Sequence, residues 1–326
     1  MNIPNLPNGK FCCFALQTRV SESITGPIPL ASNIYATTEK PFHIDEWWRQ
    51  QLGDLEIANI DRCSLFLTAQ TSSAAVDVPQ LNGLLHSYYY ALLLQGVGYV
   101  REGILLGGES SASGMRVTSI GWLAKYHEPW KVLPKDVNRE HLEATHDLVE
   151  SIETIYTQTK TDQYLRLRKG FNAFLSGIRF NEAHNRLHQF VRAIDGVIKP
   201  KKGEGTNKFK YRCGFFAGRT PQRTRLLEEL YDLRSAAEHL NPLDDNLSTY
   251  APHERENIKA LRTYQAELLA AFVYRKILTT PSFLSNFIDD ASIDQMWKQN
   301  ASQLIALWGN TIDLVTAPNG LFLDYV

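Results

Sequence analysis

The chain has 326 residues, of which 44% are hydrophobic and 21% are charged, and its formal net charge is −1. These proportions are typical of a globular protein with a real hydrophobic core, and the length fits one large domain or two ordinary ones. The near-zero charge excludes a global field that would draw the chain to nucleic acid or to a membrane, and no apolar run approaches the roughly 20 residues that span a bilayer.

The N-terminal part, residues 1–135, mixes strand and helix signals and predicts an α+β domain. Asp77 can cap a helix that has Pro79 just inside it, and leucines and tyrosines follow at helical spacing. The segment 107–114 (GGESSASG) contains none of the phosphate-loop or nucleophile patterns, so we interpret it as a flexible loop. Apolar or alternating residues predict strands at 11–20, 62–70, 98–108 and 115–126.

The C-terminal part, residues 140–326, predicts an all-α bundle, because its apolar residues recur with a period of about 3.6 almost throughout. The predicted boundary between the two parts is the segment 127–140. Pro200 ends one helical stripe, and Thr220 followed by Pro221 is a typical helix start. The predicted helices carry apolar stripes at 142–156, 164–178, 187–197, 226–240 and 258–277, with shorter helical stretches at 283–297 and 302–315.

Arg234 and His239 form the best candidate site in the chain. Five residues along a helix turn the two side chains about 140° apart, so they are not simple neighbours on one face. Arg234 lies beside the apolar stripe, where a guanidinium needs an acidic partner, a subunit interface or a ligand phosphate. The spacing alone leaves open a structural role, in which Arg234 pairs with Asp232 or Glu238 and His239 caps the helix.

The residues around this pair resemble the HEPN superfamily, helical bundles whose signature is Arg, four to six residues, then His. The string YDLRSAAEH (231–239) fits this signature, and its first residues are similar to those of the ApeA-like branch. The upstream helix string RLHQFVRAID (186–195) is also similar to that branch. The resemblance covers residues 145–280 and implies an HEPN-like helical fold there.

The resemblance implies a metal-independent endoribonuclease site that needs no cofactor, usually built across a homodimer. Arg234 would bind the phosphate, His239 would transfer a proton, and Ser235, which follows the arginine in the motif, is the third candidate catalytic residue. Active members often have Asn, Asp or His where this chain has Ser235, and the branch often has Gly where this chain has Leu240.

The family analogy leads us to expect RNA cleavage to 2′,3′-cyclic phosphate ends, in a toxin or in an effector of anti-phage abortive infection. In that interpretation the N-terminal domain, 1–135, senses a trigger or a protein partner. The alternative is a non-catalytic HEPN-type module that dimerises and binds RNA or protein, and a plain structural bundle is a third possibility.

The stretch 199–212 is rich in cations with aromatic residues among them. We interpret it as a mobile loop that grips RNA phosphates and stacks a base, with a solvated surface loop as the alternative. The predicted RNA-binding residues are Lys199, Lys201, Lys202, Lys208, Lys210 and Arg212.

Metal chemistry, disulfides and export are not expected. His184 and His188 are four apart on a predicted helix, but HNRLH lacks the glutamate of a zinc-protease motif. The four cysteines form no CxxC pair, so we expect reduced, buried thiols. The first residues, MNIPNLPNGK, have no charged-then-apolar signal pattern, which makes the cytoplasm the expected location.

Overall fold

The computed structural model describes residues 8–111, 113–158, 162–200, 205–316 and 318. The chain divides into two compact units. Near the predicted boundary, short segments of the sequence belong alternately to one unit and to the other. The N-terminal unit comprises Met1–His127 and Pro134–Glu153, and the C-terminal unit comprises Glu128–Leu133 and Thr154–Val326. Residues 140–153 were expected with the helical part, but the whole segment 134–153 belongs to the N-terminal unit. Val137 bridges Val20 there, and the Gln95 side chain donates a hydrogen bond to the His141 carbonyl.

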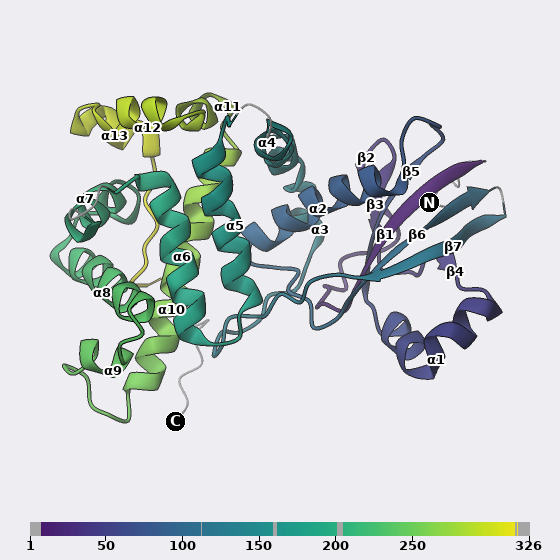
Figure 1. The fold of residues 1–326 in the computed structure, drawn as a ribbon, viewed down its shortest axis with the longest axis horizontal. Helices are drawn as coiled ribbons and strands as arrows, with labels where there is room; N and C mark the ends of the chain where they lie inside the picture. Colours follow the sequence, from purple (N-terminus) through teal and green to yellow (C-terminus); the bar gives the residue numbers. More distant parts are fainter. Residues whose placement is uncertain (1–7, 112, 159–161, 201–204, 317, 319–326) are drawn as a thin grey trace. The chain divides into compact units, whose positions relative to one another are not determined.

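The N-terminal unit is built on one sheet, with strand order β2-β3-β5-β1-β6-β7-β4 in the described residues (Figure 1). Neighbouring strands are antiparallel, except that β4 runs parallel to β7. The central strand β1 is buried along nearly its whole length, as its apolar run predicts. The strands are β1 Gly9–Leu16, β2 Ile28–Ala31, β3 Ile34–Thr37, β4 Phe42–His43, β5 Leu65–Thr71, β6 Gly103–Ser111 and β7 Gly114–Trp122.

The segment 107–114 is not the flexible loop that its composition suggests. Strand β6 continues through Ser111 and β7 begins at Gly114, so most of the segment belongs to a hairpin. Glu109 lies opposite Lys10 on one side and Arg116 on the other. These opposite charges favour strand pairing where the Gly/Ser composition alone favours a loop.

Four helices accompany the sheet in the described part of this unit. Helix α2 packs against β1 and β5, and it begins as predicted, with Pro79 in the first turn. The Asp77 side chain accepts from the Gln80 backbone N–H, and the Gln80 side chain accepts from the Asp77 backbone N–H. The helices are α1 Glu46–Asp61, α2 Val78–Leu94, α3 Arg139–Glu143 and α4 His146–Thr157, of which α4 continues into the C-terminal unit.

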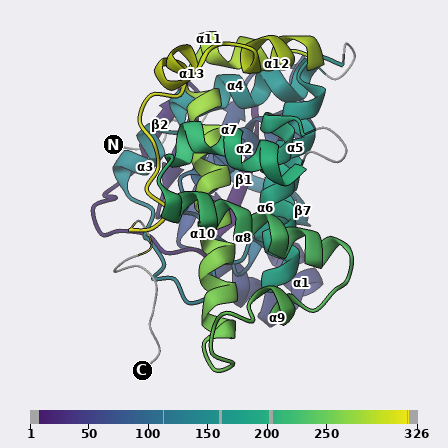
Figure 2. The ribbon, with the colours of Figure 1, turned by 90° about the vertical axis from the view of Figure 1, so that its left-hand side faces the viewer.

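The C-terminal unit is helical, and α6 is its central element because it packs against α5, α8 and α10 (Figure 2). Helices α11, α12 and α13 lie together at one end of α5 and α6 in both views. The helices are α5 Leu165–Arg179, α6 Ala183–Ile198, α7 Gly205–Ala217, α8 Pro221–Glu238, α9 Leu243–Asn246, α10 Arg255–Leu278, α11 Pro281–Leu284, α12 Asp290–Trp297 and α13 Ala301–Trp308.

Two features of α6 determine how its neighbours sit. Arg186 pairs with Glu267 of α10 at 2.8 Å, and both side chains are almost completely buried. Helix α5 crosses α6 where Gly170 meets Gly196, and a Cβ added to Gly196 would lie only 2.9 Å from the Gly170 Cα. This crossing brings the two backbones close together, with the Tyr274 hydroxyl packed beside them.

Candidate active site

Arg234 lies near the end of α8, and its guanidinium is placed between carboxylates of two helices. Nη1 pairs with Glu238 one turn further along α8, and Nη2 lies 3.7 Å from Oδ2 of Asp195 on α6. The side chain is 16% exposed and also lies over the Tyr231 ring, 5.6 Å from its centroid. The pairing with Glu238 was one of the two left open by the spacing. The contact with Asp195 arises from the packing of α6 on α8.

Asp195 is unusual because burial opposes its ionisation. Burial raises the pKa of this carboxyl to about 6, although the positive charges of Arg234 and Arg166 act to lower it. Its Oδ1 is buried without a hydrogen-bond partner among the described residues. A large fraction of this group is therefore protonated at mildly acidic pH, so that it can donate as well as accept a hydrogen bond.

His188 is a third polar group at this packing contact. Burial lowers the pKa of its ring, and the charge of Arg234 lowers it further, while a hydrogen bond to the Arg234 backbone acts in the opposite direction. His188 Nδ1 and Arg234 Nε, like Asp195 Oδ1, are buried without a partner in the described structure. Such atoms are costly unless a bound group satisfies them, so this cluster has unused capacity for hydrogen bonding.

His188 was missed as a neighbour of Arg234, because the sequence suggested it only as a possible metal ligand with His184. The available signal was its position seven residues before Asp195, two turns along the same helix face. No group of His, Cys, Asp or Glu in the described residues could hold a metal ion.

His239 immediately follows α8 and is exposed. Its side chain makes no hydrogen bond or ion pair with a described residue. The turn after it is closed by two backbone bonds, from Leu240 to the Ala237 carbonyl at 3.3 Å and from Asn241 to the Ala236 carbonyl at 2.9 Å. This is the Schellman arrangement, which needs a left-handed residue after the cap.

Leu240 occupies that left-handed position, with φ of 57°, and its side chain is 92% exposed. Glycine is the residue that adopts this conformation without strain. The position where the ApeA-like branch often has Gly is therefore one whose backbone favours Gly. Ser235 lies partly buried on α8 between Arg234 and the cap, and its carbonyl accepts from the His239 backbone at 3.1 Å.

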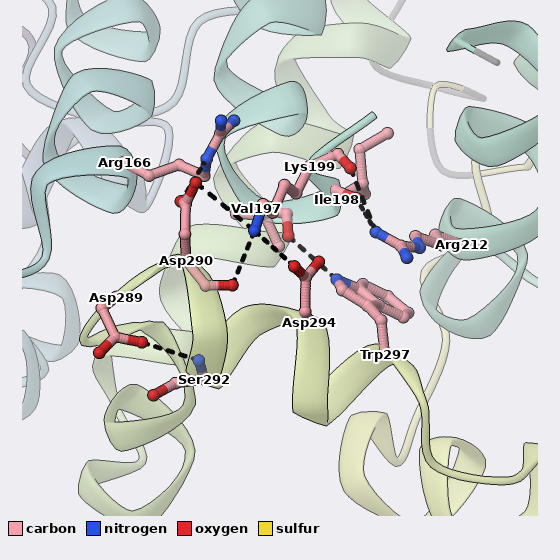
Figure 3. Close-up of polar contacts among 10 residues, drawn as sticks. All are labelled: Arg166, Val197, Ile198, Lys199, Arg212, Asp289, Asp290, Ser292, Asp294 and Trp297. Atoms are coloured by element: carbon pink, nitrogen blue, oxygen red, sulfur yellow. Dashed lines mark hydrogen bonds and ion pairs between the residues drawn. The ribbon is translucent and has the colours of Figure 1, made fainter. Parts of the chain in front are cut away.

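The predicted basic loop is wrong as a structural prediction, because Gly205–Ala217 forms helix α7. Lys199 pairs with Asp294 at 2.7 Å and with Asp290 at 3.4 Å, as Figure 3 shows. Arg212 donates to the carbonyls of Ile198 and Lys199.

Arg212 also lies over the Trp297 ring at 4.9 Å, and Lys210 pairs with Glu228 at 2.7 Å. Lys208 lies on α7, and Lys201 and Lys202 lie outside the described residues. At least three of the six cations thus stabilise the fold itself, and RNA binding by this stretch stays a prediction.

Comparison with protein-family models, curated protein sequences and solved structures gives no significant match. Membership of the HEPN superfamily therefore stays a prediction from the residue pattern. Among the described residues, no helix is both long and apolar enough to cross a bilayer.

Proposed function

We propose that the C-terminal unit is a metal-independent endoribonuclease of HEPN type, in which Arg234 binds the phosphate and His239 transfers a proton. One observation carries the proposal: an exposed histidine follows directly on a helix whose arginine lies in a cluster of buried polar atoms without described partners. This combination gives one group for proton transfer and one for anion binding five residues apart in the chain.

The chemistry needs no ion. The RNA 2′-hydroxyl attacks the adjacent phosphorus as a base removes its proton, and the bond to the 5′-oxygen breaks as an acid protonates that oxygen. The products are a 2′,3′-cyclic phosphate and a 5′-hydroxyl. A histidine can take or give the proton near neutral pH, and an arginine remains charged and binds two phosphate oxygens through its planar fork.

A complete site under this proposal contains two copies of the pair, because one histidine acts as base and another as acid. Two-fold symmetry supplies both when two C-terminal units face each other. The exposed position of His239 is compatible with such a shared cleft. The proposed biological role is that of a toxin or an anti-phage effector, with the N-terminal unit receiving a trigger or a protein partner.

For Arg234 to bind a phosphate, at least one of its two carboxylate partners must move away from the guanidinium. Glu238 is the one that can move, since its side chain is 41% exposed and an exposed ion pair contributes only about 1 kcal/mol or less. Asp195 is 15% exposed and stays beside the guanidinium, but its raised pKa weakens its competition with an anion at mildly acidic pH.

A second function is favoured by the same ion pairs. Asp195 and Glu238 together already compensate the charge of Arg234, which is what a structural arginine needs. In that case the unit is a non-catalytic module that dimerises and binds RNA or protein.

Incubation of the purified full chain with total RNA in excess EDTA tests the proposal. We expect cleavage that leaves 2′,3′-cyclic phosphate ends, and a rate reduced about a hundredfold or more in His239→Ala and in Arg234→Ala. His253→Ala is the matched control, because it removes another exposed histidine of the same unit. Glu238→Gln should bind RNA more tightly than wild type, since it releases Arg234.

Three outcomes would reject catalysis at this site: a requirement for magnesium, cleavage of DNA as well as RNA, or activity that survives His239→Ala. Binding of RNA without cleavage, unchanged in His239→Ala but weakened in Arg234→Ala, would select the non-catalytic module instead.

A further inference from the structure

A cavity of about 400 Å³ lies within the C-terminal unit, between α5, α6 and the start of α12. Arg166 and Lys169 of α5 line it together with Arg192 and Asp195 of α6. Its volume is near the lower end of the range for small-molecule sites, about 300–1,000 Å³, so it suits one small ligand rather than a folded polymer.

Two of the four described carboxylates that line the cavity, Asp289 and Asp290, already have partners in the fold. Asp290 accepts from Arg166 Nε at 3.0 Å and pairs with Lys199 at 3.4 Å (Figure 3). Asp289 accepts from the Ser292 backbone at 2.7 Å and thereby caps α12. The charge of Asp290 is therefore compensated by cations of the fold, whereas Asp289 is held by a backbone hydrogen bond and keeps its charge.

Two cations of the cavity, Lys169 and Arg192, differ from these carboxylates in having no such partners in the described part of the chain. Both line the cavity and are exposed, and neither forms an ion pair or a hydrogen bond with a residue that the structure describes. They come from neighbouring helices, so an anion in the cavity can be bound from two sides. The remaining lining carboxylate, Asp162, is exposed to solvent.

The Asp195 carboxyl also lines the cavity, and its raised pKa allows the protonated group to donate a hydrogen bond to an oxyanion. Gly170 and Gly196 belong to the lining as well, but both are buried where α5 meets α6, beside the Tyr274 hydroxyl, so that part of the wall is closed.

We propose that this cavity binds the phosphate group of a small phosphate monoester, with Lys169 and Arg192 pairing with its oxygens. The proposal needs only phosphate binding, so it stands whether or not Arg234 and His239 cleave RNA. Such a group can come from a free phosphorylated small molecule or from the 5′-phosphate at the end of an RNA strand. Because Asp195 also pairs with Arg234, an occupied cavity is linked directly to the candidate active site.

Isothermal titration calorimetry on the full chain tests this with two pairs of probes. The first pair is adenosine 5′-monophosphate and adenosine, and the second is a short RNA with a 5′-phosphate and the same RNA with a 5′-hydroxyl. We expect the phosphorylated probe of at least one pair to bind at least tenfold more tightly than its unphosphorylated partner. Preference in the first pair identifies a free small molecule, and preference in the second pair alone identifies an RNA end.

In the double variant Lys169→Gln/Arg192→Gln, the ratio between the affinities of the phosphorylated and the unphosphorylated probe should fall at least tenfold. The matched control Arg179→Gln/Arg225→Gln removes two exposed cations from α5 and α8 outside the cavity, and it should change affinity by no more than about twofold. Circular dichroism verifies the fold of both, and either single cavity variant replaces the double if the double unfolds. No preference for phosphate in either pair, or an equal loss in both double variants, would overturn the proposal.

Discussion

Asp195 shows how one side chain links folding to the candidate site. Its raised pKa means that the folded chain binds this proton more tightly than the unfolded chain does. Its contribution to stability therefore falls as the pH rises from the ordinary value of 3.8 towards about 6. The difference between these two pKa values corresponds to a cost of about 3 kcal/mol at neutral pH.

Asp195→Asn should therefore stabilise the chain at pH 7, by up to about 3 kcal/mol, because asparagine resembles the neutral carboxyl. Near pH 4 the advantage should be small, since the wild-type group is then largely protonated. Urea-induced unfolding of wild type and variant at the two pH values measures the difference. A variant less stable than wild type at pH 7 would show that the ion pair with Arg234 outweighs the cost of burial.

At the residue scale, the sequence indicated that Arg234 needs an acidic partner more readily than it indicated which residues surround it. Arg234 was expected to need an acidic partner because it lies beside an apolar stripe, and Glu238 was named from helical spacing. Asp195 and His188 lie more than thirty residues away along the chain. Their contact with Arg234 depends on how α6 packs on α8, and helical periodicity within one segment contains no information on that packing.

The crossing of α5 and α6 is an element-scale contact that one methyl group should disrupt. A Cβ on Gly170 would overlap the Tyr274 hydroxyl and lie 2.8 Å from the Ala193 carbonyl oxygen, to which that hydroxyl donates at 2.9 Å. Gly170→Ala should therefore destabilise the chain by about 2 kcal/mol or more, because both the packing and the hydrogen bond suffer.

Gly83→Ala is the control for this prediction, because Gly83 is also helical and its added Cβ meets no atom within 4 Å. That variant should be more stable than wild type by about 0.5–1 kcal/mol, as usual for glycine replaced by alanine in a helix. Thermal and urea unfolding of both variants measure the contrast. Equal effects of the two substitutions would mean that the α5–α6 contact relaxes at little cost.

Element types were predictable where a start signal and an apolar period agreed. Helix α8 begins at Pro221 after the Thr220 cap, as the sequence indicates. Helix α7 was missed because the lysines and glycines of 199–212 suggest a loop, although Phe209, Cys213 and Phe216 follow at helical spacing and are buried. The strands β6 and β7 were predicted, but their extension into the segment 107–114 was missed for a similar reason, since composition was given more weight than cross-strand pairing.

At the scale of the whole molecule, the sequence correctly indicated a mixed first part and a helical second part, but not which segments pack together. Residues 140–153 carry part of the helical stripe 142–156, so their period alone assigns them to the bundle. Their hydrogen bonds are instead made with the N-terminal unit, for instance from Gln95 to His141. A periodic pattern shows that a segment has an apolar face, but not which core buries that face.

The proposed function makes the assembly part of the active site, and this gives the last prediction. We expect a homodimer through the C-terminal unit, detectable by light scattering at micromolar concentration, because a cleavage site with both base and acid needs His239 from two subunits. Wild type and His239→Ala are mixed in varying ratio and allowed to exchange subunits. Cleavage should then fall as the square of the wild-type fraction, since only dimers with two intact histidines are active.

Mixtures of wild type with His253→Ala provide the matched control and should keep full activity at every ratio. A fall in direct proportion to the wild-type fraction would show that each subunit acts independently, either as a monomer or as one half of a dimer with two separate sites. The light-scattering mass then separates these two cases: a monomer contradicts the shared site, whereas a dimer with a proportional fall assigns both proton transfers to groups within one subunit. His188, a partly buried histidine beside Arg234, is the first residue to replace in that case.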